Sequence, residues 1–143
     1  PNGRVLAPAN GWFEWVKDPD DAKKKQPYFI TLKEQIPMFF AGLAEVHGGL
    51  EPDERNGFVI ITAASDQGMV DIHDRKPLVL APEHAREWID PETSVERAKE
   101  IAMEHCRPVT GFHWYKVRKD VGNVRNQGPH LIQPLSLVED VDD

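Results

Sequence analysis

A chain of 143 residues, of which 40% are hydrophobic and 29% charged, has the composition of a globular protein of about one domain. Its formal net charge of -7 argues against a surface coated in basic groups, and its apolar runs are too short to span a bilayer. The single cysteine, Cys106, excludes an intrachain disulfide and is compatible with a reducing, cytoplasmic compartment.

Charge is unevenly distributed along the sequence. Acidic residues gather at 18–21 and in the segment 139–143, whereas basic residues gather at 23–25, at 75–76 and between 116 and 125. The net charge of the whole chain therefore does not exclude a local basic groove.

The first half of the chain predicts short strands joined by turns and loops. We expect strands at 5–7, 12–16, 28–32, 38–46 and 58–62. The pair Asn10-Gly11 has the residue types of a tight hairpin turn. The run 58–62 is continuously β-branched or aromatic, which predicts a fully buried central strand.

In the second half the pattern changes to helical spacing. A strand at 78–80 precedes a helix at 82–89 that has Pro82 in its first turn. Thr93 and Glu96 form a capping-box signature that opens a second helix, which ends near Cys106. A strand at 112–117 and extended structure at 131–138 follow. The chain is thus expected to be an α+β domain, with a mostly antiparallel sheet or open β-barrel and two or more helices packed on it.

Glu14 is the first candidate for chemistry. In a strand, Trp12, Glu14 and Val16 share one face, so apolar neighbours would partly desolvate the carboxyl group and favour its neutral form. Such a group can act as a general acid or base near neutral pH. The alternative is that Glu14 lies on the solvent face of an edge strand, since Glu is mostly exposed.

A second candidate group lies at 73–75, directly before a short apolar strand. His73 can exchange protons near neutral pH, and Arg75 offers fork-shaped donors for phosphate. The alternatives are a hydrogen-bonded structural histidine, a turn capped by Asp74 and a surface ion pair of Arg75. The residues alone leave both interpretations open.

Several motifs, taken together, resemble those of the SOS-response-associated peptidase (SRAP) family in order and spacing. They are Ala9-Asn10-Gly11-Trp12-Phe13-Glu14-Trp15, Lys25-Gln26-Pro27-Tyr28-Phe29-Ile30, Phe40-Ala41-Gly42-Leu43, Thr62-Ala63-Ala64, Ile72-His73-Asp74-Arg75-Lys76-Pro77 and Val121-Gly122-Asn123-Val124-Arg125-Asn126-Gln127-Gly128. The resemblance spans nearly the whole chain, and several ordered motifs are far more specific than any one of them.

The resemblance implies a protein that recognises abasic sites in single-stranded DNA and shields them by a covalent crosslink. The nucleophile would be an N-terminal cysteine, whose α-amine and thiol form a thiazolidine with the ring-opened sugar. Glu14 and His73 would assist the proton transfers, and Thr62 and Arg75 would lie on the DNA-facing surface, with Arg75 as a phosphate partner. No metal or other cofactor is implied, and the expected location is the bacterial cytoplasm, at the nucleoid when the protein is engaged on DNA.

The Cys-Gly-Arg start of the family is not found in this sequence. Gly3-Arg4 leads directly into the Glu14 motif, so it corresponds to the residues just before that motif. We therefore expect residues 1–138 to be the C-terminal major part of a single SRAP-like domain, and 139–143 to be an acidic tail. The nucleophile and an orienting asparagine would belong to a preceding portion, and Cys106 would be structural. This polypeptide alone is then expected to lack crosslinking activity.

Two other function classes remain open. The chain would be a non-catalytic module that binds single-stranded DNA or a protein partner, or else a metal-dependent hydrolase. For the hydrolase, no histidine pair has the spacing of His-Glu-x-x-His, and there is no Cys-x-x-Cys. No serine or cysteine triad pattern supports general proteolysis. The histidines available to a metal are His47, His73, His84, His105, His113 and His130.

Overall fold

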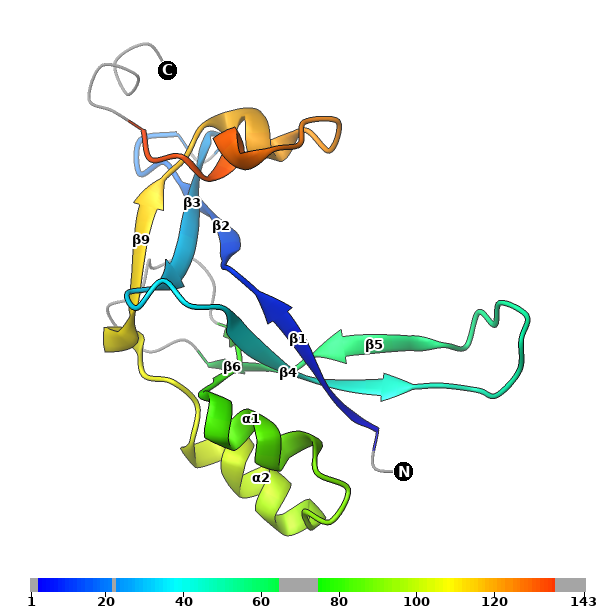
Figure 1. Cartoon of the computed structure of the whole chain (residues 1–143). Coiled ribbons are helices and arrows are strands. Elements are labelled where there is room, and N and C mark those ends of the chain that lie inside the picture. Colours follow the sequence, from blue (N-terminus) through cyan, green and yellow to red (C-terminus); the bar gives the residue numbers. More distant parts are fainter. Residues whose placement is uncertain (1–2, 22, 65–74, 136–143) are drawn as a thin grey trace.

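The computed structural model describes residues 3–21, 23–64 and 75–135. In these ranges the chain forms three antiparallel sheets and two α-helices, and the sheets do not close into a barrel. Figure 1 shows the two helices side by side at one end of the molecule and the sheet that contains β3 and β9 at the other. The expected α+β class with mostly antiparallel strands is confirmed.

The largest sheet is built around β4 (Met38–Glu45). One edge of β4 pairs with β1 (Arg4–Ala9), in a register that runs from Arg4 opposite Leu43 to Ala9 opposite Met38. The other edge is shared by β8 (Val79–Leu80) and β5 (Gly57–Ile60), each of which pairs with a different part of β4.

The strands that share this edge separate at Ala41. The amide of Ile61 donates to the carbonyl of Ala41, the amide of Ala41 donates to Leu78, and the amide of Leu78 donates to Ile61, each at 2.9 Å. After Ile61 and before Leu78 the chain forms a two-stranded ladder of β6 (Thr62–Ala64) and β7 (Arg75–Pro77). Ala41 is therefore the point at which this ladder leaves the large sheet.

The prediction of one fully buried strand at 58–62 is wrong in two respects. The segment divides at Ile61 into β5 and β6, and the side chains of Phe58 and Val59 are 63% and 62% exposed. The physical reason is that β5 is an edge strand, to which only β4 is paired within the described part of the chain. An apolar run shows which side chains can be buried but not whether a partner covers them.

The second sheet has the order β2-β3-β9, with β2 (Trp12–Lys17), β3 (Lys25–Leu32) and β9 (Phe112–Lys116). Since β1 and β2 belong to different sheets, Asn10-Gly11 does not close a hairpin as predicted but carries the chain from one sheet to the other. This transition needs a residue without a side chain. A Cβ at Gly11 would lie 2.4 Å from the carbonyl oxygen of Ile30 and 2.4 Å from the ring of Phe29.

The helices form where the sequence indicates, as α1 (Pro82–Ile89) and α2 (Val95–Glu104). The residue that caps α2 differs from the predicted one, because the hydroxyl of Ser94 accepts from the amide of Arg97 at 3.1 Å. Thr93 instead donates its hydroxyl proton to the carbonyl of Glu87 at 2.7 Å. Thr93 thereby fastens the loop between the helices to the end of α1.

Arg4 ties β1 to the C-terminal end of α1. Its Nε donates to the carbonyl of Trp88 at 2.6 Å, and its Nη2 donates to the carbonyls of Asp90 and Thr93 at 3.1 and 2.8 Å. The side chain is buried. A guanidinium at this position satisfies carbonyls that the end of a helix leaves unpaired, and its charge is favourable at the negative end of the helix dipole.

Two apolar clusters form the core. One lies between the large sheet and the helices, and the other lies between the two larger sheets. Buried members of the first are Ala41, Leu78, Leu80, Ala85, Trp88, Ala98 and Ile101, and those of the second are Ile30, Leu32, Met38, Val79 and Phe112. Cys106 is a free, partly buried thiol that packs against the first cluster and forms a single β-bridge with Leu80.

Three short 3-10 turns complete the structure: η1 (Val109–Gly111), η2 (Lys119–Gly122) and η3 (Pro129–Ile132). The extended structure predicted from residue 131 is therefore wrong for Leu131 and Ile132, because Pro129 starts a helical turn there. Residues 136–138 of that prediction lie outside the described residues. The segment is tied to β9, since the amide of Leu135 donates to Lys116 and the hydroxyl of Tyr115 donates to Ile132.

None of the described helices has the length and apolar character needed to cross a membrane.

We expect Gly11→Ala to lower the free energy of unfolding by about 1–3 kcal/mol, because the new methyl group overlaps a backbone carbonyl that cannot move freely. Urea unfolding of this chain measures the effect. Gly57→Ala is the matched control, since a Cβ there has no heavy atom within 4 Å. Equal stability of the two variants would contradict the close approach at Gly11.

We expect Glu87 to make stability depend on acid pH. Arg97 donates Nε and Nη2 to the two carboxylate oxygens of Glu87 at 2.6 and 2.9 Å, and this hydrogen bonding holds the pKa of Glu87 below its ordinary value. The stabilisation is therefore present above the ordinary carboxyl pKa and is lost as pH falls through the lowered one. Glu87→Gln should show a smaller loss of unfolding free energy on acidification than the unaltered chain.

Urea unfolding at a series of pH values tests this expectation. Glu83→Gln, at an exposed position of the same helix, controls for the removal of one negative charge. Parallel stability-against-pH curves for Glu87→Gln and the unaltered chain would show that the ion pair has no such role.

Candidate functional site

Glu14 lies midway along β2, in a row of polar side chains that crosses the second sheet. It is directly opposite Tyr28 of β3, which in turn is directly opposite Lys116 of β9. Directly opposed residues of antiparallel strands project from the same face. A carboxyl, a phenol and an ammonium group therefore follow one another across this sheet.

Trp12 supports Glu14 from the same strand. The indole Nε1 of Trp12 donates to Oε1 of Glu14 at 3.1 Å, which confirms that the two side chains share a face. The indole itself is held edge-on between Phe40 and Phe112, with ring centroids 5.9 and 5.6 Å away. Glu14 is half-buried, so its carboxyl group is held by a rigid neighbour and is still partly open to solvent.

Thr62 and Arg75 come from the two strands of the small ladder. Thr62 is opposite Pro77, and Ala64 is opposite Arg75, so the fold brings these two sequence motifs together. Thr62 is exposed. His73 lies outside the described residues, two positions before Arg75, and its place in the site stays a prediction.

Strand β4 connects the small ladder to the strand that carries Glu14. Phe40 of β4 contacts Trp12, and its neighbour Ala41 is the point from which β6 and β7 diverge. Glu14 thus belongs to one sheet, and Thr62 and Arg75 to another. Their common support is the packed centre of the molecule rather than a loop.

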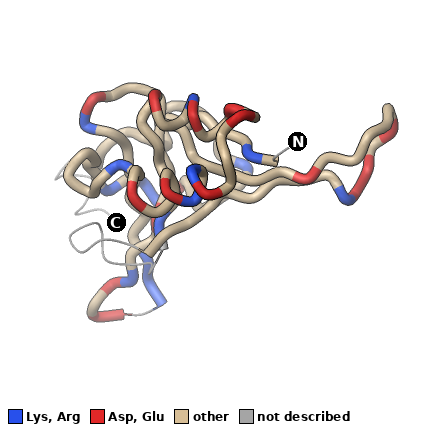
Figure 2. The backbone as a smooth tube through the Cα atoms, turned by 90° about the horizontal axis from the view of Figure 1, so that it is seen from below, with Lys and Arg blue, Asp and Glu red and all other residues tan. Residues whose placement is uncertain are grey.

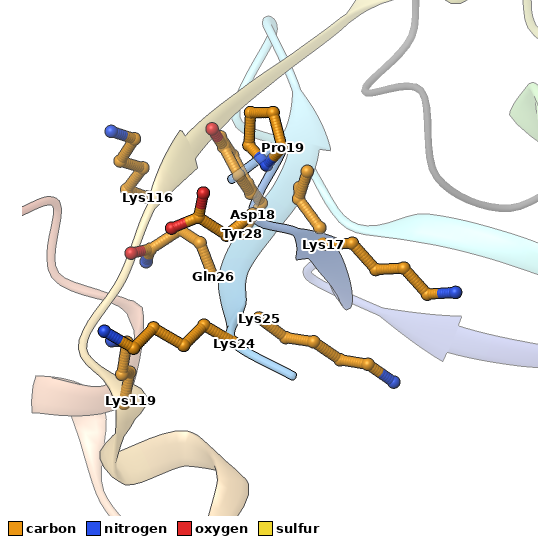
Figure 3. Close-up of a pocket in the computed structure, with 10 residues that line it drawn as sticks. Lys17, Asp18, Pro19, Lys24, Lys25, Gln26, Tyr28, Lys116 and Lys119 are labelled. Carbon is orange, nitrogen blue, oxygen red and sulfur yellow. The ribbon is translucent and has the colours of Figure 1, made fainter. Parts of the chain in front are cut away.

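A basic hollow lies beside Glu14, at the end of the second sheet. Its volume is about 340 Å³, and Tyr28 and Lys116 of the polar row contribute to its lining (Figure 3). The remaining lysines come from β2, from the start of β3 and the loop before it, and from η2. The lysines that line it are Lys17, Lys24, Lys25, Lys116 and Lys119.

The sequence shows four of these lysines in two separate basic segments, at 23–25 and at 116–125, and Lys17 outside both. Pairing of β3 with β9 brings the segments together, and this register is not visible in local sequence patterns. Along the backbone as a whole, acidic and basic positions are interspersed, as Figure 2 shows. The lysines around this hollow therefore give it a local positive charge, although the net charge of the chain is negative.

The described histidines do not converge on one point. His84 and His105 stack with ring centroids 4.6 Å apart, whereas His47 is within 3.3 Å of Glu45, and His113 and His130 belong to β9 and η3. Among the described residues, one group of possible metal ligands has its atoms within 4.8 Å of one another, namely Glu100, Glu104 and His105. Its two carboxylates are exposed, and exposed acidic groups are common without a metal ion, so the group does not by itself indicate a metal centre.

Comparison with known proteins places these features in a family. A family model described as SOS response associated peptidase (SRAP) matches residues 1–124. The chain is 51% identical over 138 residues to the abasic site processing protein YedK of Escherichia coli (strain K12), which covers 94% of this chain and 59% of that protein. It is 31% identical over 131 residues to the abasic site processing protein YoqW of Bacillus subtilis, covering 91% of this chain and 57% of YoqW.

Two solved structures are similar to this chain in fold. A phage-related protein from Bordetella bronchiseptica matches with a TM-score of 0.69 and 49% identity, over 82% of this chain and 54% of that one. A protein from Bacteroides thetaiotaomicron matches with a TM-score of 0.74 over 94% of this chain and 58% of that one, and at 22% identity this likeness concerns the fold alone.

The chain spans 59% of the length of the E. coli relative. Because the family model covers most of the chain, and because the E. coli relative is 51% identical over nearly all of it, this chain belongs to the SOS response associated peptidase (SRAP) family.

Proposed function

We propose that the protein to which this chain belongs processes abasic sites in single-stranded DNA and captures them in a covalent thiazolidine crosslink. The observation that carries the proposal is the half-buried carboxyl group of Glu14, which is held by Trp12 inside a family motif. Support also comes from relatives that are named abasic site processing proteins.

In this proposal the α-amine of an N-terminal cysteine attacks the aldehyde of the ring-opened sugar. Loss of water from the resulting carbinolamine gives an imine, and the thiol then adds to the imine carbon while the nitrogen takes up a proton. Glu14 would deliver a proton to the departing hydroxyl group and later remove one from nitrogen. His73 would supply the proton at the sugar ring oxygen as the ring opens.

Thr62 and Arg75 would contact the DNA strand rather than the reacting atoms. The register of β6 and β7 places both residues on one short ladder. A guanidinium can donate two parallel hydrogen bonds to a phosphate, whereas a threonine hydroxyl can donate one. We propose that these two residues hold the backbone next to the lesion.

The nucleophile would be supplied by a part of the protein outside this chain. Cys106 is internal, so its nitrogen belongs to a peptide bond and it has no α-amine to offer. The chain spans 59% of the E. coli relative, which leaves room in a protein of that length for a further segment. The exposed apolar side chains of Val46, Phe58 and Val59 support packing of such a segment against the large sheet.

We expect Glu14→Gln and His73→Gln to slow crosslinking by roughly a hundredfold, because each removes a proton-transfer group. The full-length protein is incubated with a single-stranded abasic oligonucleotide, and the adduct is followed by denaturing electrophoresis. Glu51→Gln and His130→Gln, at exposed positions away from Glu14, are the matched controls and should react at the unaltered rate.

The absence of any covalent adduct from the full-length protein would overturn the proposal. It would also be overturned if the Glu14 and His73 variants both formed and resolved the adduct at the unaltered rate.

A second candidate function is a module that holds single-stranded DNA without chemistry. It is favoured by the lysines that line one hollow, because such charge can hold a phosphodiester backbone without any chemistry. A gel shift with abasic and intact oligonucleotides separates the two functions. Equal and fully reversible binding of both oligonucleotides by the full-length protein would favour the module.

A further inference from the structure

We propose that the lysine-lined hollow at the end of the second sheet binds the phosphodiester backbone of the DNA strand that enters the Glu14 site. The inference rests on the proposed function and names a second contact surface for the same strand. It arises from the concentration of positive charge: five of the nine lysines in the sequence line this one hollow, and only Lys23, Lys33, Lys76 and Lys99 lie elsewhere.

The hollow is continuous with the polar row that contains Glu14. Tyr28 belongs to both, and Lys116 stands two strands away from Glu14 on the same face. Adjacent strands are about 4.8 Å apart, so Glu14 and Lys116 are separated by roughly 10 Å across the sheet. A strand whose lesion lies at Glu14 can therefore place a neighbouring phosphate at the hollow.

The lysines are available to an anion. Among the ion pairs within the described residues, none joins one of these five lysines to a carboxylate. Figure 3 shows the ammonium ends of Lys24, Lys116 and Lys119 on one side of the hollow, whereas those of Lys17 and Lys25 point away from them. Positive charge is thus concentrated on the side of Lys24, Lys116 and Lys119, where a nucleic-acid backbone would be held.

Gln26, which lines the hollow, is held by hydrogen bonds to the backbone. The side-chain amide of Gln26 donates to the carbonyls of Pro27 and Val117, at 3.0 and 2.9 Å, and so braces β3 against the end of β9. Asp18 also lines the hollow, but Oδ1 of its carboxylate accepts from the amide of Asp20 at 2.9 Å, within the turn of its own loop. Its negative charge offsets part of the positive charge of the hollow.

The kind of charge favours a polymer over a small anion. Lysine ammonium groups are flexible point charges without the fixed fork of arginine, so they suit repeated, loosely positioned phosphates. Several of them acting along one strand release counterions, which gives strong and salt-dependent binding. An acidic protein segment carries similar charge, and competition with poly-glutamate separates that partner from DNA.

The test measures binding of the full-length protein to an intact single-stranded oligonucleotide, by fluorescence anisotropy at several salt concentrations. Replacing Lys24, Lys116 and Lys119 together by glutamine should lower the slope of log affinity against log salt by about 2, at roughly 0.7 per lost phosphate contact. Affinity at low salt should fall more than tenfold. The matched control replaces Lys33, Lys99 and Arg86, which are exposed and lie away from the hollow, and should keep both the slope and the affinity.

Three results would overturn the inference: equal losses in the two triple variants, an unchanged slope in the Lys24, Lys116 and Lys119 variant, or absence of binding. Displacement of the oligonucleotide by poly-glutamate at equal charge concentration would also overturn it, in favour of an acidic protein partner. The intact oligonucleotide has no aldehyde, so this outcome is independent of adduct formation. A protein that makes no adduct but shows the expected loss of slope would refute the proposed function and retain the contact surface.

Discussion

The arrangement of the candidate site depends on three backbone hydrogen bonds at Ala41. They connect Ala41, Ile61 and Leu78 in a closed set at 2.9 Å each, at the position where β5 and β8 meet along one edge of β4. Buried amide and carbonyl groups must be paired, so the strands that leave this point do so in a fixed direction. The ladder that carries Thr62 and Arg75 starts here, and the neighbouring Phe40 contacts the indole that holds Glu14. The segments of the site are thus mounted on one buried centre.

The two flanks of this centre are fastened by different means. On the helical side, the buried guanidinium of Arg4 joins β1 to carbonyls in the last turn of α1 and in the loop after it, which combines hydrogen bonding with a favourable interaction at the negative end of the helix. On the side of the second sheet, the absence of a side chain at Gly11 lets the chain pass against the carbonyl of Ile30 and enter β2. The charged contact of Arg4 holds β1 against the helices. The missing side chain of Gly11 allows the chain to pass closely against β3, and this sets the position of β2 relative to β1.

Local charge, rather than net charge, explains how an acidic protein can present a surface for DNA. A chain of net charge -7 still carries five lysines around one hollow, because pairing of β3 with β9 brings two basic segments together, and Asp18 is the one carboxylate among the residues that line it. Screening limits the influence of distant carboxylates to about 8 Å at physiological salt. A strand held at Glu14 would therefore experience mainly the polar row and the hollow beside it.

The sequence by itself determined the family, the α+β class, both helices and most strands, because ordered motifs, capping residues and apolar periodicity act over short distances along the chain. It also identified the shared face of Trp12 and Glu14, which follows from the twofold repeat of a strand. Only the tertiary structure decided that 58–62 divides at Ile61 and leaves Phe58 and Val59 exposed, that Asn10-Gly11 joins two sheets, and that Ser94 rather than Thr93 caps α2. It alone brought the lysines at 24 and 119 into one hollow. Apart from the local cap at Ser94, pairing between distant strands sets these features, and the partner and register of a strand are properties of the packed molecule rather than of any local segment.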